Sequence, residues 1–234
     1  LTKETPEILS GVFSIKEGLP LNTFYMARAA GVDPLTGKQL FWAYKKDANG
    51  NMIEGSEYIT SKVAEATNSK YYLGSRIPDL YGSIGSSLTY KDFDLYVLTV
   101  YSIGGKVDDN LYASSMSPDY VNQTWHKNAL RRWQKVGDKT DVPRALYGDA
   151  SIANDRFLLD ASYFAIKNIT LGYTIPASLI RKAGIVSARL FTSVDNLALF
   201  CHMDGLDPQY NFSGTNTFSY APAKTWTVGL EVKF

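Results

Sequence analysis

Hydrophobic and polar residues alternate along residues 225–234, the last ten of the chain. The apolar positions are Trp226, Val228, Leu230, Val232 and Phe234. A period of two places this set on one face of a β-strand and the intervening threonine, glycine, glutamate and lysine residues on the other. About ten alternating residues is also the length of a tilted strand that crosses a bilayer. The pattern therefore predicts a membrane-crossing strand.

Other segments carry β-strand patterns of similar length. A short polar connection joins the segments at residues 81–90 and 95–103, which predicts that these two form a hairpin. A further segment at residues 24–32 is a weaker match, because Arg28 interrupts one face. With the final strand, we count about six strands. The other five are at residues 39–45, 81–90, 95–103, 162–175 and 188–200.

The pattern changes phase within residues 162–175. Phe164 and Ile166 occupy even positions, whereas the following apolar residues, from Ile169 to Ile175, occupy odd ones. A single extra residue in a strand reverses which face each later side chain occupies. We therefore predict a β-bulge at residues 167–168, or a boundary there between a loop-side extension and the membrane-crossing part.

The connections between the strands alternate in length. An up-and-down barrel of the outer membrane has short turns on the periplasmic side and long loops outside. We therefore predict an all-β fold, an antiparallel segment of an up-and-down transmembrane β-barrel. About six strands are fewer than the roughly eight that a closed membrane barrel needs, so other strands must complete it. The short connections are residues 33–38, 91–93 and 176–187, and the long ones are residues 47–79, 104–161 and 201–223.

The composition limits the possible partners and agrees with this fold. The chain has 234 residues and a net charge of +1, so no nucleic-acid partner is expected. No apolar run reaches ~18 residues, which excludes a membrane-spanning helix but leaves spanning strands possible. The 16 tyrosines suit a membrane interface or a sugar-stacking surface. Because the first residue is Leu1 and not methionine, we expect a processed protein or a piece of a longer one.

One long segment and several short ones carry a recognisable pattern. Residues 160–176 read DASYFAIKNITLGYTIP. The short segments read KEGLPL (16–21), GVDPLTG (31–37), IPDLYG (77–82), FDL (93–95), YSIGGK (101–106), DVPR (141–144) and VDNL (194–197). Together they resemble SusC/RagA-type TonB-dependent transporters, which are outer-membrane proteins of Bacteroidetes bacteria. The segments occur in family order over nearly the whole chain, and this ordered set is more specific than any one of them.

The resemblance implies partners that the chain does not itself contain. Such transporters have an N-terminal plug, a segment that contacts TonB and a barrel of about 22 strands. A SusD-like lipoprotein covers the barrel as a lid, and the usual cargo is glycan oligomers or peptides. Residues 1–234 match the C-terminal part of the barrel, without the plug or the remaining strands. The expected location is the outer membrane of a Bacteroidetes-like bacterium, in contact with the lipid bilayer.

Two sets of residues are candidates for function. The apolar set of residues 225–234, which ends at Phe234, resembles the signal that the outer-membrane assembly machinery recognises by pairing with a free strand edge. The alternative is an ordinary final strand. The second set comprises polar partners of the lipid-facing residues, which would line the barrel lumen. It consists of Arg189, Asp195, Glu231 and Lys233.

No pattern indicates catalysis, a cofactor or a metal site. The carboxylates are scattered, so no pair suggests a glycoside hydrolase. Four residues from Cys201 to Asp207, with His202 and Asp204, fit no standard zinc spacing. Because Cys201 is the only cysteine, an intrachain disulfide is impossible. Two alternatives to a transporter stay open here, namely a soluble β-sandwich that binds glycans through exposed tyrosine and tryptophan, and a hydrolase.

Overall fold

The structure is a computed structural model that describes residues 6–119, 124–148, 152–202, 205–209, 213–216 and 220–234. The chain forms two compact units, each built from several segments. We call the first the loop unit, and it comprises Leu1–Ile77, Gly105–Asp160 and Asn211–Phe218. We call the second the strand unit, and it comprises Pro78–Gly104, Ala161–Tyr210 and Ser219–Phe234.

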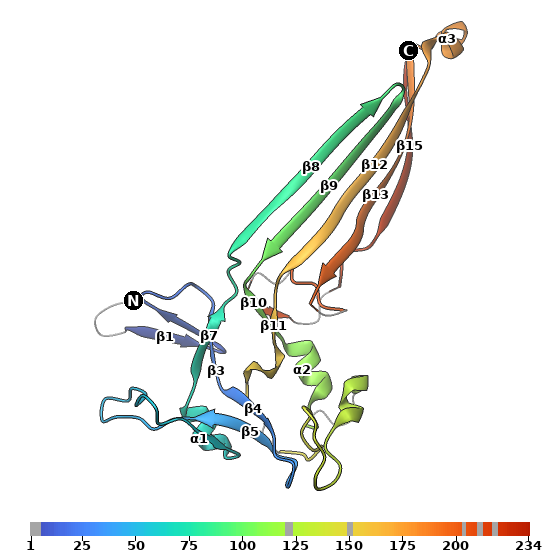
Figure 1. The fold of residues 1–234 in the computed structure, drawn as a ribbon. Coiled ribbons are helices and arrows are strands. Elements are labelled where there is room, and N and C mark those ends of the chain that lie inside the picture. The colour runs from blue at the N-terminus through green and yellow to red at the C-terminus, as the bar shows by residue number, and fades with distance from the viewer. Residues whose placement is uncertain (1–5, 120–123, 149–151, 203–204, 210–212, 217–219) are drawn as a thin grey trace. The chain divides into compact units, whose positions relative to one another are not determined.

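The strand unit is one antiparallel sheet of five long strands (Figure 1). Its order is β15-β13-β12-β9-β8. The strands are β8 (Leu80–Tyr90), β9 (Phe93–Ile103), β12 (Tyr163–Ile175), β13 (Ser187–Cys201) and β15 (Thr225–Lys233). The expected hairpin of β8 and β9 is confirmed, and its register runs from Leu80 opposite Ile103 to Tyr90 opposite Phe93.

Short connections lie at one end of this sheet. Lys91, at a φ of 53°, supplies the left-handed conformation that a two-residue hairpin turn requires. Helix α3 (Ala177–Ile180) and the 3₁₀ helix η3 (Arg181–Ala183) join β12 to β13 at the same end. The two short connections at residues 91–93 and 176–187 are therefore confirmed, and the chain passes into the loop unit at the opposite strand ends.

The predicted β-bulge is present in β12. The register shifts between Ile166 and Asn168 against both neighbouring strands. On one side of the bulge Ile169 pairs with Val97, and on the other side Ile166 pairs with Thr99. Ile169 and Ile166 therefore lie on the same face as the odd-numbered residues of β9. The extra residue, Lys167, thus keeps the even and odd apolar sets of β12 on one face.

The loop unit contains three small sheets. Their orders are β1-β2-β3-β7, β4-β5-β6 and β11-β10-β14, where β10 pairs with β14 in parallel. The strands are β1 (Glu7–Ser10), β2 (Phe13–Lys16), β3 (Thr23–Met26), β4 (Arg28–Val32), β5 (Gln39–Ala43), β6 (Tyr58–Thr60), β7 (Tyr71–Ser75), β10 (Lys106–Asp109), β11 (Leu158–Asp160) and β14 (Thr215–Asn216).

Short helices and small apolar clusters complete the loop unit. Phe24, Met26, Phe41 and Val107 are fully buried. One cluster joins Ala27, Phe41 and Ala66 and another joins Met116, Ala129 and Val142. The helices are α1 (Val63–Asn68), α2 (Asn110–Met116), and the 3₁₀ helices η1 (Lys127–Arg131) and η2 (Asp155–Phe157).

The long sheet has one strand fewer than the count of six. Of the expected strand at residues 39–45, residues 39–43 form β5, which pairs with β4 across the expected turn at residues 33–38. Both strands belong to the loop unit, so this short turn is not one of the turns of the long sheet. Their five-residue lengths are about half of what a membrane-crossing strand needs.

No helix among the described residues is long and apolar enough to span a membrane.

Candidate functional site

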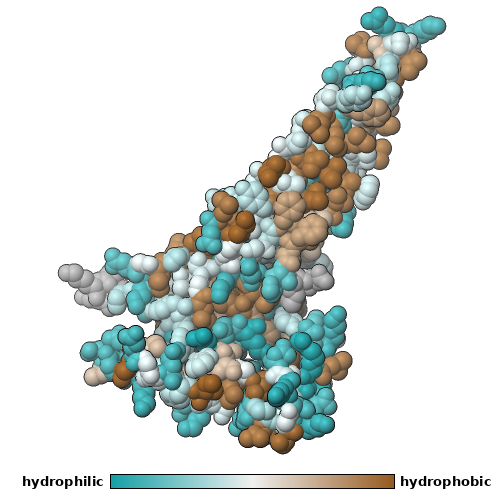
Figure 2. All heavy atoms as spheres, in the orientation of Figure 1, coloured by the Kyte–Doolittle hydropathy of each residue, from teal (hydrophilic) through white to brown (hydrophobic). Residues whose placement is uncertain are grey.

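One face of the long sheet is apolar and uncovered. On β15, Val228 is 73 % exposed and Phe234 is 88 % exposed. Trp226 and Leu230 are also exposed, and Val232 is half-buried. Figure 2 shows hydrophobic residues along much of the sheet. Exposing so much contiguous apolar surface to water is rare in soluble proteins, and such patches mark contact with a protein or a membrane.

The same face continues across the neighbouring strands through cross-strand pairs. Leu230 lies opposite Leu190, which lies opposite Tyr173 on β12. Tyr173 lies opposite Phe93, with ring centroids 4.7 Å apart. Tyr90 lies opposite Phe93 on β8. The apolar surface therefore spans the sheet from edge to edge.

Aromatic residues lie towards both ends of this face. Phe93, Tyr90 and Tyr173 lie near the short turns, while Tyr101 and Phe164 pair near the other end. The eight residue steps from Phe93 to Tyr101 cover about 27 Å along the strand, or about 20 Å at a tilt of about 40°. This matches the apolar band of about 25 Å between two aromatic girdles that outer-membrane barrels present to lipid.

The opposite face carries the charged side chains of the sheet, and two ion pairs lie on it. Arg189 Nε donates to Asp94 Oδ1 at 3.0 Å, and Arg189 Nη2 donates to Asp94 Oδ2 at 2.5 Å. This bidentate pair joins β13 to β9 across β12. Glu231 lies opposite Arg189 and also forms an ion pair with Lys233 at 3.5 Å. A fork of two parallel hydrogen bonds fixes the guanidinium more firmly than a single contact would.

A network of hydrogen bonds extends this polar face towards the bulge. Asn168 Nδ2 donates to Asp195 Oδ1 at 2.7 Å and to Ser193 Oγ at 2.9 Å. The Thr170 hydroxyl lies 2.9 Å from both Asn168 Oδ1 and Ser193 Oγ. These bonds connect β12 and β13 side by side and give each amide and hydroxyl a partner within the sheet.

Two glycines make room on the polar face. A Cβ on Gly172 would overlap the Asp94 carboxylate and the Arg189 guanidinium. A Cβ on Gly229 would overlap the ring of Phe191, which lies across it. Neither glycine has a positive φ, so the close approach of these side chains, and not backbone conformation, explains glycine at both positions.

The structure brings both predicted sets of residues together, each on one face. All five apolar residues of the predicted signal occupy one face of β15 or its end. The four polar candidates occupy the other, as their pairings show. The sequence analysis did not predict the residues that hydrogen-bond with these candidates and with one another on the polar face. They are Asp94, Asn168, Ser193 and Thr170. The FDL segment already contained Asp94, but strand pairing alone reveals that it meets Arg189.

The residues considered for a metal site are described only in part. No group of three or more histidine, cysteine, aspartate or glutamate residues among them could hold a metal ion. Around Cys201, the thiol contacts the Leu206 carbonyl at 3.1 Å, while Asp204 of the suggested cluster lies outside the described residues.

These features define a class of protein. The long sheet is an antiparallel segment of a transmembrane β-barrel, with one face towards lipid, and it is part of a larger barrel. Both of its outer strands, β8 and β15, have an edge that no described strand covers. The observed fold is therefore a barrel segment and not the soluble β-sandwich that was the alternative.

The comparisons with known proteins agree with this class. No family model matches the chain. TonB-dependent receptor P3 of Formosa agariphila is 29 % identical over 180 residues, which cover 72 % of the chain and 18 % of the relative. TonB-dependent receptor SusC of Bacteroides thetaiotaomicron is 25 % identical over 222 residues, which cover 94 % of the chain and 20 % of the relative.

Solved structures give the same result. The RagAB peptide importer in its closed-closed state matches with a TM-score of 0.85 at 25 % identity, over 100 % of this chain and 25 % of that one. A structure of the RagAB peptide transporter matches with a TM-score of 0.82 at 26 % identity. The chain is thus a relative of SusC/RagA-type TonB-dependent transporters of the outer membrane, and the expected outer-membrane location is confirmed. It spans about a fifth of the length of the curated relatives.

Proposed function

We propose that this chain is the C-terminal barrel segment of an outer-membrane importer that takes up nutrient oligomers with energy supplied through TonB. The observation that carries this proposal is the two-faced long sheet, whose likeness to the RagAB importer covers 100 % of the chain. A sheet with a lipid face and a paired polar face has the properties of a barrel wall. On this proposal the chain moves cargo and catalyses no reaction.

The proposed partners follow from what the sheet leaves open. The edges of β8 and β15 need further strands, because unpaired backbone groups are costly in a bilayer. The rest of the barrel would supply these strands, and a plug would fill the lumen. A SusD-like lipoprotein would cover the outer opening, and TonB would contact the plug-bearing part. On this proposal Arg189, Asp195, Glu231 and Lys233 face the lumen, where they brace the wall.

We propose glycan oligomers as the cargo class, with peptides as the second candidate. SusC is a relative of this chain, and RagAB is described as a peptide importer. The loop unit adds exposed or half-buried tyrosines, such as Tyr72 stacked on Tyr25 at 4.8 Å, and aromatic faces of this kind bind sugar rings.

An uptake experiment tests the cargo and the energy source together. Host cells with and without an in-frame deletion of the segment that encodes β8–β15 are given fluorescent oligosaccharides or oligopeptides. We expect the deletion to abolish accumulation of the oligosaccharides, and loss of TonB to do the same. If only the peptides accumulate, the cargo is peptides and not glycan oligomers. Accumulation that persists without TonB would contradict energised transport.

We further propose that β15 and Phe234 carry an assembly signal. The free edge of β15 can pair with a strand of the outer-membrane assembly machinery, and the exposed aromatic ring can enter a pocket there. The apolar residues Trp226, Val228, Leu230 and Val232 would form the matching face.

Replacing the terminal ring tests this signal. Phe234→Ala removes about 1.5–3 kcal/mol of apolar burial in the recognising pocket, so recognition weakens roughly ten- to hundred-fold. We expect a marked loss of the protein from outer-membrane fractions, measured by immunoblot. Phe200→Ala on β13 is the matched control, because it removes an exposed aromatic ring far from residue 234. Equal losses for both variants, or none for Phe234→Ala, would refute the signal.

A further inference from the structure

The loop unit contains a small, partly open cavity that transport does not explain. Its volume is about 250 Å³. Helix α2, the first residue of β5, strand β10 and the segment around η2 line it. It lies wholly within the loop unit. This is slightly below the ~300–1,000 Å³ typical of sites for drug-sized ligands, so it suits a smaller molecule.

A buried amide on the wall of the cavity lacks a partner. Gln39 is only 5 % exposed, and its Nε2 donates to the carbonyl oxygens of Gly31 at 2.8 Å and Leu40 at 3.1 Å. Because both partners are carbonyl oxygens, the amide atom that contacts them must be the nitrogen, and the other amide atom is the oxygen, Oε1. Oε1 is the one side-chain oxygen or nitrogen among the described residues that has neither accessible surface nor a hydrogen-bond partner. A buried acceptor without a donor costs about 1–3 kcal/mol, so this wall of the cavity is polar and not well satisfied.

Four charged residues line the cavity, and Asp119 and Arg144 have hydrogen-bond partners, whereas the other two, of opposite sign, are unpaired among the described residues. Asp108 is 5 % exposed, and burial, assisted by the neighbouring charge of Asp109, raises its pKa to about 6. Arg156 is half-buried, and burial lowers the pKa of its guanidinium, which lies 5.0 Å from the Phe157 ring centroid. Within the described part of the chain, neither side chain makes an ion pair or a hydrogen bond. Desolvated charges of this kind are usually paired.

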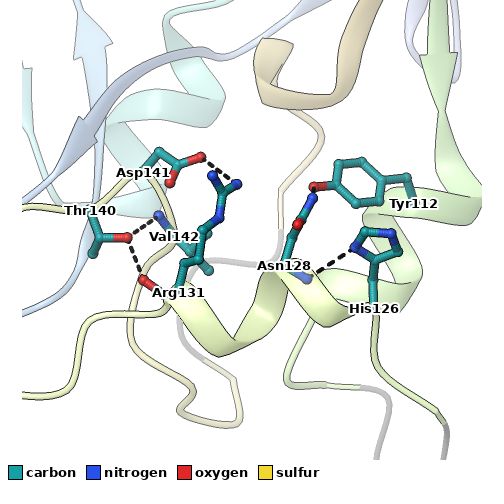
Figure 3. Close-up of polar contacts among 7 residues, drawn as sticks. All are labelled: Tyr112, His126, Asn128, Arg131, Thr140, Asp141 and Val142. Carbon is teal, nitrogen blue, oxygen red and sulfur yellow. Dashed lines mark hydrogen bonds and ion pairs between the residues drawn. The ribbon is translucent and has the colours of Figure 1, made fainter. Parts of the chain in front are cut away.

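The wall that carries these groups is held in place by its own contacts (Figure 3). Asn128 Nδ2 donates to Tyr112 Oη at 2.8 Å, and the Asn128 backbone N–H donates to His126 Nδ1 at 3.1 Å. Tyr112 meets the Phe157 ring edge-on at 5.5 Å. Met116 of α2 packs with Ala129 and Val142. The cavity is thus preformed between ordered elements, which lowers the cost of binding.

We propose that this cavity binds a small zwitterion, of the class of free α-amino acids. An ammonium group supplies donors for the Asp108 carboxylate, and a carboxylate accepts from Arg156. A ligand with both charges forms an ion pair with both groups at once. A neutral polyol would form an ion pair with neither group, and an ion of one sign would pair with only one of them. This inference does not depend on transport through the barrel.

A ligand panel tests the proposal on the detergent-purified outer-membrane complex that contains this chain. Calorimetric titration at pH 7.5, where the Asp108 carboxyl is ionised, compares L-alanine with methylamine, acetate and glucose. We expect L-alanine to bind at least about ten-fold more tightly than methylamine or acetate, because each of these lacks one charged contact. If glucose binds saturably and L-alanine does not, the ligand is a polyol and the zwitterion proposal is wrong. No saturable binding of L-alanine would overturn the proposal.

Variants locate the binding in the cavity. Asp108→Asn and Arg156→Gln should each weaken L-alanine roughly ten- to hundred-fold, whereas Arg156→Lys retains most of the affinity. Lys62→Gln and Glu65→Gln are matched charge-removing controls on α1, outside the cavity, and should leave the affinity unchanged. Thermal unfolding verifies that each variant is folded. Unchanged affinity in folded Asp108→Asn and Arg156→Gln would exclude this cavity. Because uptake plays no part in the titration, its result is independent of the proposed transport.

Discussion

Val228→Arg is expected to cost about 2–4 kcal/mol of folding free energy in the membrane, the value for arginine on the lipid face of a barrel near its midplane. Val228 is 73 % exposed in the middle of β15, on the apolar face. A guanidinium there must leave water for hydrocarbon or draw water in with it. Much less folded protein should therefore reach the outer membrane.

The control is the neighbouring residue on the opposite face. Thr227 lies opposite Ser193, on the polar side of the sheet, at almost the same depth. Thr227→Arg is expected to fold nearly normally, because the added charge faces polar groups. The folded fraction of both variants is measured by heat-modifiable gel mobility after membrane fractionation. If Thr227→Arg proves as harmful as Val228→Arg, the assignment of the lipid face is wrong.

Removing Asp94 or Arg189 is the second large effect that we expect. Their side chains are 32 % and 30 % exposed, between a surface pair, worth about 0–1 kcal/mol, and a buried one, whose disruption costs about 3–5 kcal/mol. A coupling of about 2 kcal/mol is therefore expected from a double-mutant cycle of Asp94→Ala and Arg189→Ala. Urea unfolding in detergent or lipid measures it.

A weaker ion pair on the same face calibrates this result. Glu231 and Lys233 are 3.5 Å apart and more exposed, so their coupling should stay below about 0.5 kcal/mol. Gly172→Val supplies an independent check, because a side chain there displaces the Asp94–Arg189 pair. Gly172→Val should cost more folding free energy in the native protein than in the Asp94→Ala/Arg189→Ala double variant, where the pair is already absent. Similar couplings for the two ion pairs would contradict the bracing role of Arg189.

A lipid face and a polar face together explain why so few strands suffice to identify the barrel. The apolar residues show where the sheet meets lipid, and the paired charges show which side is shielded from it. The described strands form only part of a closed wall, so stability of the assembled protein must include the strands that pair with β8 and β15. The variants above therefore report on the whole barrel.

The residue pattern by itself determined the strands and the faces of the long sheet. Alternation places Val228 and Leu230 on one side and Thr227 and Glu231 on the other, because successive side chains in a strand point in opposite directions. The same rule predicted the bulge near Lys167, since only an extra residue reconciles the two phases. These are local properties, and any strand with this sequence would share them.

Only the tertiary structure decided which strands are neighbours and what their polar residues meet. The strand at residues 39–45 has a plausible pattern, but it pairs within the loop unit, because a short hairpin carries no information about the sheet it joins. Asp94 and Arg189 are 95 residues apart and meet only because β12 lies between their strands with Gly172 beneath them. The cavity of Gln39, Asp108 and Arg156 likewise assembles segments far apart in the chain. Long-range packing creates such sites, and no periodicity along the sequence records it.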